Sequence, residues 1–284
     1  MTAPASATAR RRFEGRVALV TGAAKGQGRS HALALAAEGA DLLLLDVAAD
    51  IPATRYPQGT AEQLAETVAL AERSGARVVA RQVDVRDRGA VDGLVAEGLD
   101  RFGRLDVALA NAGIIQLKPA LELTDDDWAD MIGINLTGVW HTVRAALRPM
   151  VERGSGSVVV TSSAAGVKGP PNMAHYAAAK AGVLGLARSL ANEVGPAGVR
   201  LNSVLPTTVD TDMVHWPEAY RLFRPDLEAP TRDDVAPVFA SLNVLPVPWI
   251  EARDVTNAVL WLASDEARYV HGVALPVDAG TVIT

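Results

Sequence analysis

Tyr176 and Lys180 are four residues apart, a spacing that places two side chains on the same face of a helix. Such a pair suits acid–base chemistry, because removing hydride from a secondary alcohol requires a base that takes the hydroxyl proton. A free phenol has a pKa near about 10, so a tyrosine base at neutral pH needs a pKa lowered by ~2–3 units, or about 3–4 kcal/mol. A cation about 4 Å away contributes about 4 kcal/mol at an effective dielectric constant of ~20. A lysine at this spacing is therefore sufficient to activate a tyrosine base, although a Tyr–Lys pair taken alone is usually a surface pair, and the catalytic interpretation depends on the further motifs below.

A glycine-rich stretch near the N-terminus, TGAAKGQG at Thr21–Gly28, suits the binding of a phosphate group. It follows an apolar run that is typical of a buried strand, and it opens a segment of helical composition. The start of a helix attracts anions through free N–H groups, and Gly22, Gly26 and Gly28 let the backbone approach closely. The spacing G-x-x-x-G-x-G differs from the common G-x-G-x-x-G dinucleotide pattern. The stretch predicts a pyrophosphate site, with a purely structural turn as the alternative.

Asp46 ends the second apolar run, 18 residues after Gly28. A carboxylate at this point of a dinucleotide-binding fold accepts hydrogen bonds from the ribose hydroxyls of NAD and repels the additional phosphate of NADP. Lys25 would favour NADP, but the like-charge repulsion from Asp46 is more direct, so the sequence predicts NAD. Asp84 and Val85 end the third run, where they either border the adenine or lead into the next helix with Asp84 as its cap.

The elements that hold these residues follow from the alternation of apolar runs and helical patterns. Runs rich in Val and Leu are typical of strands that are buried on both faces of a parallel sheet. Thr60 and Gln63 form a helix-capping pattern, and Gly75 supplies the stop. The alternation predicts an α/β fold, a single-domain Rossmann-type doubly wound parallel sheet flanked by helices. The predicted strands are Val17–Thr21, Asp41–Val47, Arg77–Asp84, Val107–Asn111, Ser157–Ser162, Val199–Leu205 and Gly272–Asp278, and further predicted helices are Gly28–Gly39, Arg88–Arg101, Thr124–Arg153 and His175–Val194.

Two connections are longer than the ~4–6 residues usual between elements, and long loops in compact domains are often functional. The first, 47–59, follows Asp46 and is expected to lie beside the adenosine, with a disordered surface loop as the alternative. The second, 207–250, is expected to form an apolar lid over a hydrophobic alcohol, with packing in the core or between subunits as the alternative. The lid hypothesis rests on apolar and aromatic density in a chain with 5% aromatic residues, namely on Met213, Val214, Trp216, Tyr220, Leu222, Phe223 and Trp249.

The composition argues against several classes of protein. The 284 residues are 49% hydrophobic, carry a net charge of −6 and include no cysteine. Nucleic-acid binding usually needs a basic face, thiolate metal sites need cysteine, and a membrane span needs about 18 consecutive apolar residues. The lack of cysteine fits the cytoplasm. Arg10-Arg11-Arg12-Phe13 resembles an export signal, but cleavage there would destroy the glycine stretch, so we expect a disordered tail at 1–12 and one domain at 13–284.

Five motifs resemble, in order, the short-chain dehydrogenase/reductase superfamily from about Arg16 to Ala279. They are Thr21-Gly22-x-x-x-Gly26-x-Gly28, Asn111-Ala112-Gly113, Asn135, Ser163 and Tyr176-x-x-x-Lys180. Three segments are similar to its mycofactocin-coupled, carveol-dehydrogenase-like subgroup: TGAAKGQGRSHALALAAEGAD, the insertion after Asp46, and LPVPWIEARDVTNAVLWLASDEARYVHGVALPVDAG. Ala110, Thr207 and His271 depart from the broad superfamily. The first two fit the subgroup, and His271 lies near the C-terminal strand, where it casts little doubt on catalysis.

The resemblance implies a role for each of four residues. Tyr176 would be the acid/base, and Lys180 would hold the nicotinamide ribose and lower the pKa of Tyr176. Ser163 would hydrogen-bond the reacting oxygen, with Ser162 as the alternative. Asn135 would anchor a water that leads to Lys180.

The resemblance also implies a cofactor, a substrate and partners. The cofactor would be tightly held NAD, reoxidised by the redox cofactor mycofactocin, and the substrate a hydrophobic secondary alcohol or ketone such as the terpenoid carveol. A homotetramer is expected, without a metal, nucleic acid or membrane partner. The alternatives are a carbonyl reductase of another small or lipid-like ketone and a non-catalytic NAD sensor, which the intact Ser163, Tyr176 and Lys180 disfavour. His175 faces another way than Tyr176 and is expected in the pocket or at the surface. The implied cofactor contacts are Gly22, Lys25, Gly26, Gln27, Gly28, Asp46, Val47, Asp84, Val85, Asn111, Ala112, Gly113, Tyr176, Lys180, Pro206, Thr208, Val209, Thr211 and Met213.

Overall fold

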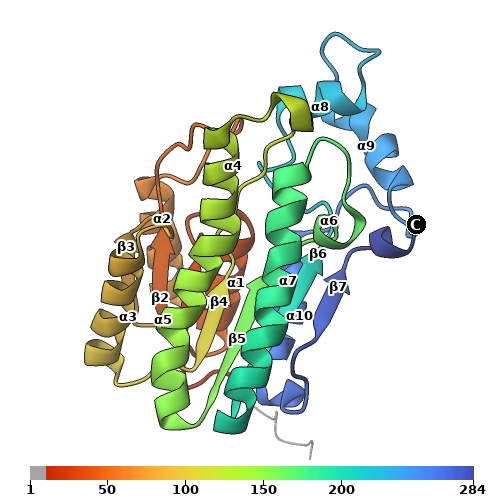
Figure 1. The fold of residues 1–284 in the computed structure, drawn as a ribbon. Coiled ribbons are helices and arrows are strands. Elements are labelled where there is room, and N and C mark those ends of the chain that lie inside the picture. The colour runs from red at the N-terminus through yellow and green to blue at the C-terminus, as the bar shows by residue number, and fades with distance from the viewer. Residues whose placement is uncertain (1–10) are drawn as a thin grey trace, which may run out of the picture.

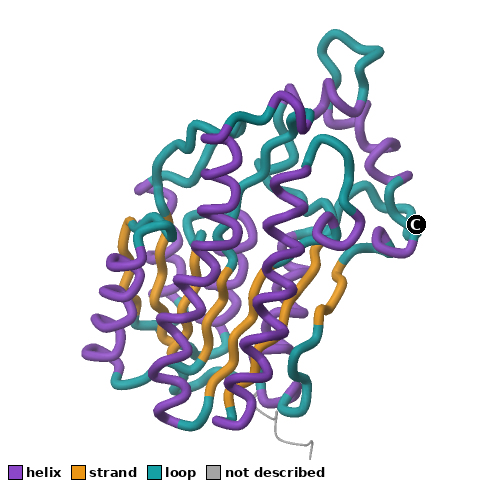
Figure 2. The backbone as a smooth tube through the Cα atoms, in the orientation of Figure 1, coloured by secondary structure: helices purple, strands orange, loops and turns teal. Residues whose placement is uncertain are grey.

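The computed structural model describes residues 11–284, which form one parallel sheet with helices on both faces (Figure 1 and Figure 2). The strand order is β3-β2-β1-β4-β5-β6-β7, so the order reverses between β1 and β4. This is the predicted doubly wound fold, and every predicted strand occurs, with ends within two residues of the prediction. The strands are β1 (Val17–Thr21), β2 (Asp41–Asp46), β3 (Val78–Gln82), β4 (Val107–Ala110), β5 (Gly156–Thr161), β6 (Val199–Pro206) and β7 (Ala274–Val277).

Helices cover the sheet in two layers. The first layer contains α3 (Arg88–Phe102), α5 (Gly138–Arg153) and α7 (Ala174–Val194), and the second contains α1 (Gly26–Ala37), α2 (Ala61–Arg73) and α10 (Ala252–Ala263). The predicted Thr60–Gln63 capping box begins α2. The remaining helical segments are η1 (Ala120–Glu122), α4 (Asp125–Ile132), η2 (Gly133–Thr137), α6 (Ala165–Lys168), η3 (Gly195–Ala197), α8 (Pro217–Phe223), α9 (Arg232–Ser241), η4 (Asp265–Ala267) and η5 (Thr281–Ile283).

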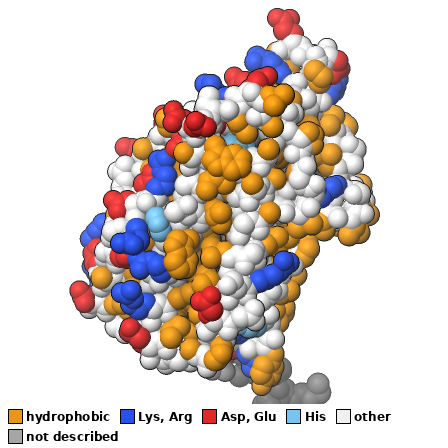
Figure 3. All heavy atoms as spheres, viewed as in Figure 1, with side chains coloured by type: hydrophobic (Ala, Val, Ile, Leu, Met, Phe, Trp, Pro, Cys, Tyr) orange, Lys and Arg blue, Asp and Glu red, His pale blue; other side chains and the backbone are white. Residues whose placement is uncertain are grey.

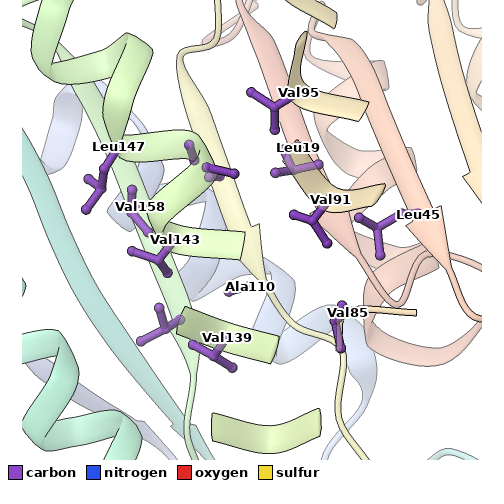
Figure 4. Packing of buried hydrophobic residues seen from close by; sticks show 14 of the residues in the cluster. Leu19, Leu45, Val85, Val91, Val95, Ala110, Val139, Val143, Leu147 and Val158 are labelled. Atoms are coloured by element: carbon purple, nitrogen blue, oxygen red, sulfur yellow. The ribbon is translucent and has the colours of Figure 1, made fainter. Parts of the chain in front are cut away.

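The central strands are buried on both faces because successive side chains point into two different cores. In β2, Leu43 and Leu45 pack toward α3, α5 and α7, whereas Leu42 and Leu44 pack toward α1 and α10. Figure 4 shows the first of these cores, where Leu45 lies near Val91 of α3. This packing fixes the edge of the sheet at which the strand ends and their loops meet.

The segment from 124 to 153 differs from the prediction of one uninterrupted helix. A π-helical turn, η2, separates α4 from α5. Within this turn, the side chain of Asn135 donates to the Met131 carbonyl oxygen (3.1 Å) and to the Ile114 carbonyl oxygen (3.0 Å) outside the helix. Asn is a poor residue for a regular helix interior, and π turns often occur at functional sites.

The start of the ordered domain also differs from the prediction. Residues 1–10 of the expected tail lie outside the described residues, but Arg11 and Arg12 lie within them. Arg12 pairs with the carboxylates of Glu38, just after α1, and Glu266. The assignment of these two arginines to a disordered tail was therefore wrong, because the carboxylates hold this part of the chain on the domain.

Both long connections are packed. Segment 47–59 buries Ile51, Ala53 and Tyr56, so the alternative of a disordered surface loop is not what the structure shows. Segment 207–250 contains α8 and α9, which the sequence analysis did not predict.

Within residues 11–284, no helix is both long enough and apolar enough to cross a bilayer. The same residues contain no cluster of three or more His, Asp or Glu side chains that could hold a metal ion.

Candidate functional site

A cavity of about 320 Å³ opens at the carboxyl ends of the strands, where the strand order reverses. Ligands of doubly wound proteins bind at this switch point. Fourteen of the predicted cofactor contacts line the cavity: Gly22, Lys25, Gly26, Gln27, Gly28, Asp46, Val47, Asp84, Val85, Asn111, Ala112, Gly113, Thr211 and Met213.

The glycine stretch is shaped by contacts that only glycine tolerates. Gly22 and Gly26 have positive φ angles of 71° and 56°, which favour glycine. A Cβ atom on Gly28 would lie 1.9 Å from the Gly22 carbonyl oxygen. Lys25, which precedes Gly26, is the N-cap of α1. Among the described residues its side chain makes no capping hydrogen bond. The first turn of α1 therefore faces the cavity with N–H groups suited to an anion.

Asp46 is fixed in the cavity wall by the backbone. Its carboxylate accepts hydrogen bonds from the Ala24 N–H (2.9 Å) and the Ala48 N–H (3.0 Å). An ionised carboxylate has about four acceptor positions, so two remain for hydroxyl groups. Lys25 does not point freely into the cavity, because its ammonium donates to the Pro57 carbonyl oxygen and pairs with Asp212 at 2.8 Å.

Asp84 and Val85 lie in the cavity wall beyond β3. Asp84 accepts from the Arg86 N–H (2.8 Å), and the cap of α3 is Asp87, which accepts from the Ala90 N–H (3.0 Å). The alternative interpretation of Asp84 as the helix cap was therefore wrong.

Tyr176 and Lys180 are buried on one face of α7, as their spacing predicts. The Lys180 ammonium lies 5.7 Å from the centre of the Tyr176 ring and donates to the Thr161 carbonyl oxygen at 2.9 Å. Against the rise that burial causes, Ser163 is the serine that lowers the pKa of the Tyr176 phenol. Ser162 instead donates to the backbone carbonyl oxygen of Lys180 (2.8 Å), so Ser163 is the serine beside the phenol.

The pKa values of Tyr176 and Lys180 differ from those expected from the sequence. Burial raises the pKa of Tyr176, and Ser163 opposes that rise. Burial lowers the pKa of Lys180 to about 8. The expected lowering of the Tyr176 pKa by Lys180 is therefore not seen, because desolvation dominates and the ammonium is directed at Thr161.

Gly113 joins the catalytic candidates to the cavity. A Cβ atom on Gly113 would lie 2.7 Å from Asn135 Oδ1 and 3.3 Å from Lys180 Nζ. Asn135 is fully buried, and its Oδ1 accepts from the Ile114 N–H (3.2 Å). Asn135 and Lys180 therefore meet directly behind a residue of the cavity wall.

Five predicted cofactor contacts are not among the residues that line this cavity within the described chain, namely Tyr176, Lys180, Pro206, Thr208 and Val209. Pro206 accepts a hydrogen bond from the Ala164 N–H through its carbonyl oxygen (3.0 Å), and Thr208 accepts from the Ile250 N–H (3.0 Å). Val209 is buried in the second core. Pro206 and Thr208 thus hold the beginning of segment 207–250 against Ala164 and Ile250.

Two residues of this region were missed or misplaced by the sequence analysis. Tyr56 lines the cavity, and an aromatic residue in an insertion directly after Asp46 was the signal for it. His175 was expected in the pocket or at the surface, but it is fully buried and hydrogen-bonds Gln116 (2.9 Å). Two aromatic residues of the expected lid, Phe223 and Trp249, pack with Phe239 and not over the cavity.

A second cavity of about 550 Å³ lies at the amino ends of the strands. Three of its lining arginines form ion pairs, because Arg104 and Arg153 pair with Asp106 and Arg16 pairs with Asp265. Arg200 donates to backbone carbonyl oxygens at the end of α10, where a cation offsets the helix dipole. His271 also lines this cavity, at the end of the sheet opposite to Tyr176.

The comparisons with known proteins identify the family of this chain. The family model for short chain dehydrogenase matches residues 16–219. The (-)-trans-carveol dehydrogenase of Rhodococcus erythropolis is 50% identical over 96% of this chain and 99% of its own. The crystal structure of carveol dehydrogenase from Mycobacterium avium in complex with NAD superposes with a TM-score of 0.95, at 51% identity over 96% of this chain and 99% of that one. Levodione reductase of Leifsonia aquatica is 35% identical over 99% of this chain and 98% of its own. With a matching family model and relatives that are similar over nearly its whole length, the chain belongs to the short-chain dehydrogenase family.

Proposed function

We propose that this protein is an NAD-dependent dehydrogenase that transfers hydride between NAD and a hydrophobic secondary alcohol or ketone. A terpenoid alcohol such as carveol is the proposed substrate. The observation that carries the proposal is the position of Gly113. It lines the same cavity as the glycine stretch, and a Cβ atom at this position would lie directly beside the side chains of Asn135 and Lys180. The NAD named with the similar crystal structure from Mycobacterium avium supports the choice of cofactor.

The cavity residues fit NAD in their donor and acceptor chemistry. The N–H groups at the start of α1 would bind the pyrophosphate, and Asp46 would accept hydrogen bonds from the adenosine ribose. The same carboxylate would repel the 2′-phosphate of NADP. NAD supplies the hydride acceptor, and the protein supplies position and proton transfer.

The proton chemistry is assigned to the residues of α7 and the loop after β5. Tyr176 would take the hydroxyl proton of the alcohol, and Ser163 would donate a hydrogen bond to the same oxygen. Lys180 would hold the nicotinamide ribose. Asn135 would anchor a water that connects Lys180 with solvent.

The substrate end of the site is apolar. Tyr56 and Trp216 are buried together, and Ile115, Leu117 and Met213 pack against them. Apolar surface near the reacting phenol favours a hydrophobic alcohol over a polar one, because such an alcohol loses water-exposed area on binding.

The decisive experiment is a screen of alcohols with the purified protein and NAD, using Tyr176→Phe as its partner variant. We expect oxidation of cyclic terpenoid alcohols, and a loss of turnover of about 10³-fold in Tyr176→Phe with NAD binding retained. Turnover that survives in Tyr176→Phe, or a preference for small polar alcohols, would contradict the proposal.

Reduction of a ketone is a second candidate, supported by the levodione reductase relative. Rates measured in both directions at cellular ratios of NAD to NADH would separate a dehydrogenase from a carbonyl reductase.

We further propose that NAD is held tightly and reoxidised in place by mycofactocin. The packing of segment 47–59 over the cavity supports slow release, since Val47, Ile51 and Gly59 line the cavity together with Asp46. Denaturing the purified protein and assaying the supernatant by mass spectrometry tests this, and the expected result is about one NAD per chain. An artificial electron acceptor should then support turnover without added NAD.

A homotetramer in the cytoplasm completes the proposal. Hydrophobic side chains are spread over the face formed by α4, α5 and α7 (Figure 3). Trp140 of α5 is 38% exposed, and the small residues Ala178, Ala181 and Gly185 lie on the exposed side of α7. Small residues let helices of two subunits approach closely. The lack of cysteine supports the cytoplasm. Light scattering after size exclusion measures the state, and Trp140→Glu is expected to shift it toward smaller species.

A further inference from the structure

Tyr56 belongs to the insertion after Asp46, yet it is directed toward segment 207–250 and the loop after β4. We infer that Tyr56, together with Trp216, forms the wall of the substrate pocket and selects cyclic apolar alcohols over open-chain ones. The inference rests on the proposed function and assigns its substrate selection to one residue of the insertion.

The position of the Tyr56 ring is fixed from two sides. The side chain is 6% exposed, and its ring centre lies 6.1 Å from that of Trp216 with an interplanar angle of 38°. Its hydroxyl oxygen accepts a hydrogen bond from the Ile115 N–H at 3.0 Å. The insertion after Asp46, segment 207–250 and the loop after β4 therefore all contact one aromatic side chain, that of Tyr56.

This meeting point lies at the catalytic end of the cavity. Ile115 follows Gly113 by two residues, and Gly113 separates the cavity from Lys180. Tyr56 itself lines the cavity. Tyr56 also lies close enough to Tyr176 for the charge of one phenol to raise the pKa of the other.

In the wall formed by Tyr56 and Trp216, the hydroxyl hydrogen of Tyr56 is the one polar group of the two side chains that has no hydrogen-bond partner among the described residues. The indole N–H of Trp216 is used, since it donates to the Met213 carbonyl oxygen at 3.0 Å. Ile115, Leu117 and Met213 surround the two rings with apolar side chains. A rigid, apolar wall gains most from a substrate that covers it with a ring, whereas a short open-chain alcohol has less apolar surface to place against it.

The test compares Tyr56→Ala and Tyr56→Phe with Tyr269→Ala, a matched control whose tyrosine is 89% exposed. The kcat/KM for carveol and for propan-2-ol is measured with NAD, and the binding of carvone, the ketone of carveol, to the NAD-loaded protein is measured by calorimetry. Tyr56→Ala should lower the ratio of the two kcat/KM values by about tenfold or more and weaken carvone binding similarly, as expected for loss of one buried ring. Tyr56→Phe keeps the ring and should retain most of the ratio, and Tyr269→Ala should match the wild type.

Each other outcome is informative. Equal losses for carveol and propan-2-ol, or no loss for either, would overturn the inference and leave the proposed function standing. Loss of NAD from Tyr56→Ala, seen by mass spectrometry while saturating NAD restores the wild-type ratio, would overturn it in favour of a cofactor role. If the wild type oxidised no alcohol, the proposed function would fail, and carvone binding would still decide whether Tyr56 forms an apolar wall. Melting temperatures of all variants identify any that fail to fold, in which case Trp216→Leu takes the place of Tyr56→Ala.

Discussion

Lys180 directs its ammonium at the backbone carbonyl oxygen of Thr161, with 2.9 Å between the two atoms. The hydrogen bond holds a buried charge at the end of β5, where the chain turns toward Ser163. Since burial lowers the pKa of this ammonium to about 8, its charge is present at neutral pH and is lost within the range in which activity is measured.

The first prediction concerns the pH dependence that follows. Lys180 is charged below pH about 8 and neutral above it. We expect kcat/KM for alcohol oxidation to fall as the pH rises through that value, because Lys180 loses its positive charge. Lys180→Arg keeps its charge, so its profile should not decline there, whereas Lys180→Met should be impaired at every pH. Profiles from about pH 6 to 10 measure this, and a wild-type profile without an inflection near the pKa of Lys180 would contradict it.

A second prediction concerns the choice between NAD and NADP. Asp46→Asn removes the negative charge but keeps one acceptor for the Ala24 N–H. We expect NAD to bind about tenfold more weakly and NADP to bind more tightly, since charged hydrogen bonds contribute about 1.5–3 kcal/mol. Fluorescence titration with both cofactors gives the ratio. Asp50→Asn, which removes the same charge from an exposed position in the same segment, should leave the ratio unchanged.

A third prediction compares two glycines. Gly28→Ala places a methyl group 1.9 Å from the Gly22 carbonyl oxygen, so we expect destabilisation of about 1–3 kcal/mol and a loss of NAD affinity. Gly93→Ala in α3 meets no described atom within 4 Å and should stabilise the protein by about 1 kcal/mol. Urea unfolding and NAD titration of both variants provide the measurements. Comparable stability of the two variants would be inconsistent with the close approach at Gly28.

A fourth prediction concerns the buried hydrogen bond between His175 and Gln116. The Gln116 amide NH₂ donates to Asp127 (2.7 Å), so its carbonyl oxygen faces His175, whose Nε2 must carry the proton. His175→Phe leaves that oxygen unpaired and should cost about 1–3 kcal/mol. Combining it with Gln116→Leu should cost less than the sum of the single changes. A double-mutant cycle by urea unfolding measures the coupling, and purely additive effects would argue against the hydrogen bond.

A fifth prediction concerns stability in acid. Burial lowers the pKa of His31 to about 3, from about 6.5 when unfolded. Below pH ~6.5 the unfolded state takes up a proton that the folded state does not, so stability falls toward pH ~3 at about 1.36 kcal/mol per unit. Between pH ~6.5 and 5 this group contributes a loss of about 2 kcal/mol. His31→Leu should flatten this part of the unfolding profile by that amount, and an unchanged slope would show that His31 is not buried in its neutral form.

The sheet was predictable from the sequence because its signal is local. In β2, four successive leucines between two aspartates have no partner on a solvated face, so only a strand buried on both faces fits them. The glycine stretch was predictable for the same reason. Gly22 and Gly26 adopt positive φ angles, and Gly28 lies against the carbonyl oxygen of Gly22, so these requirements arise within the stretch itself. Asp46 followed from its place at the end of a strand.

Other features depend on contacts between distant segments. The direction of the Lys180 ammonium depends on the Thr161 carbonyl oxygen, and the burial of His175 depends on Gln116 in another loop. The place of Tyr56 requires Ile115 and Trp216, neither of which has a spacing relationship to it. Such contacts arise from the tertiary arrangement, which no periodicity in one segment reveals. The apolar residues of 207–250 illustrate the same limit, because their composition could not show which of them pack on one another.

The π-helical turn between α4 and α5 restricts how this protein can change. The wide turn holds one residue more than a regular α-helical turn, so removing one residue from η2 would restore regular hydrogen bonds and keep the faces of the flanking helices. What the shorter turn would lose is the widened backbone from which Asn135 donates to the carbonyl oxygens of Met131 and Ile114. The extra residue therefore serves the placement of one side chain and not the folding of the two helices that flank it.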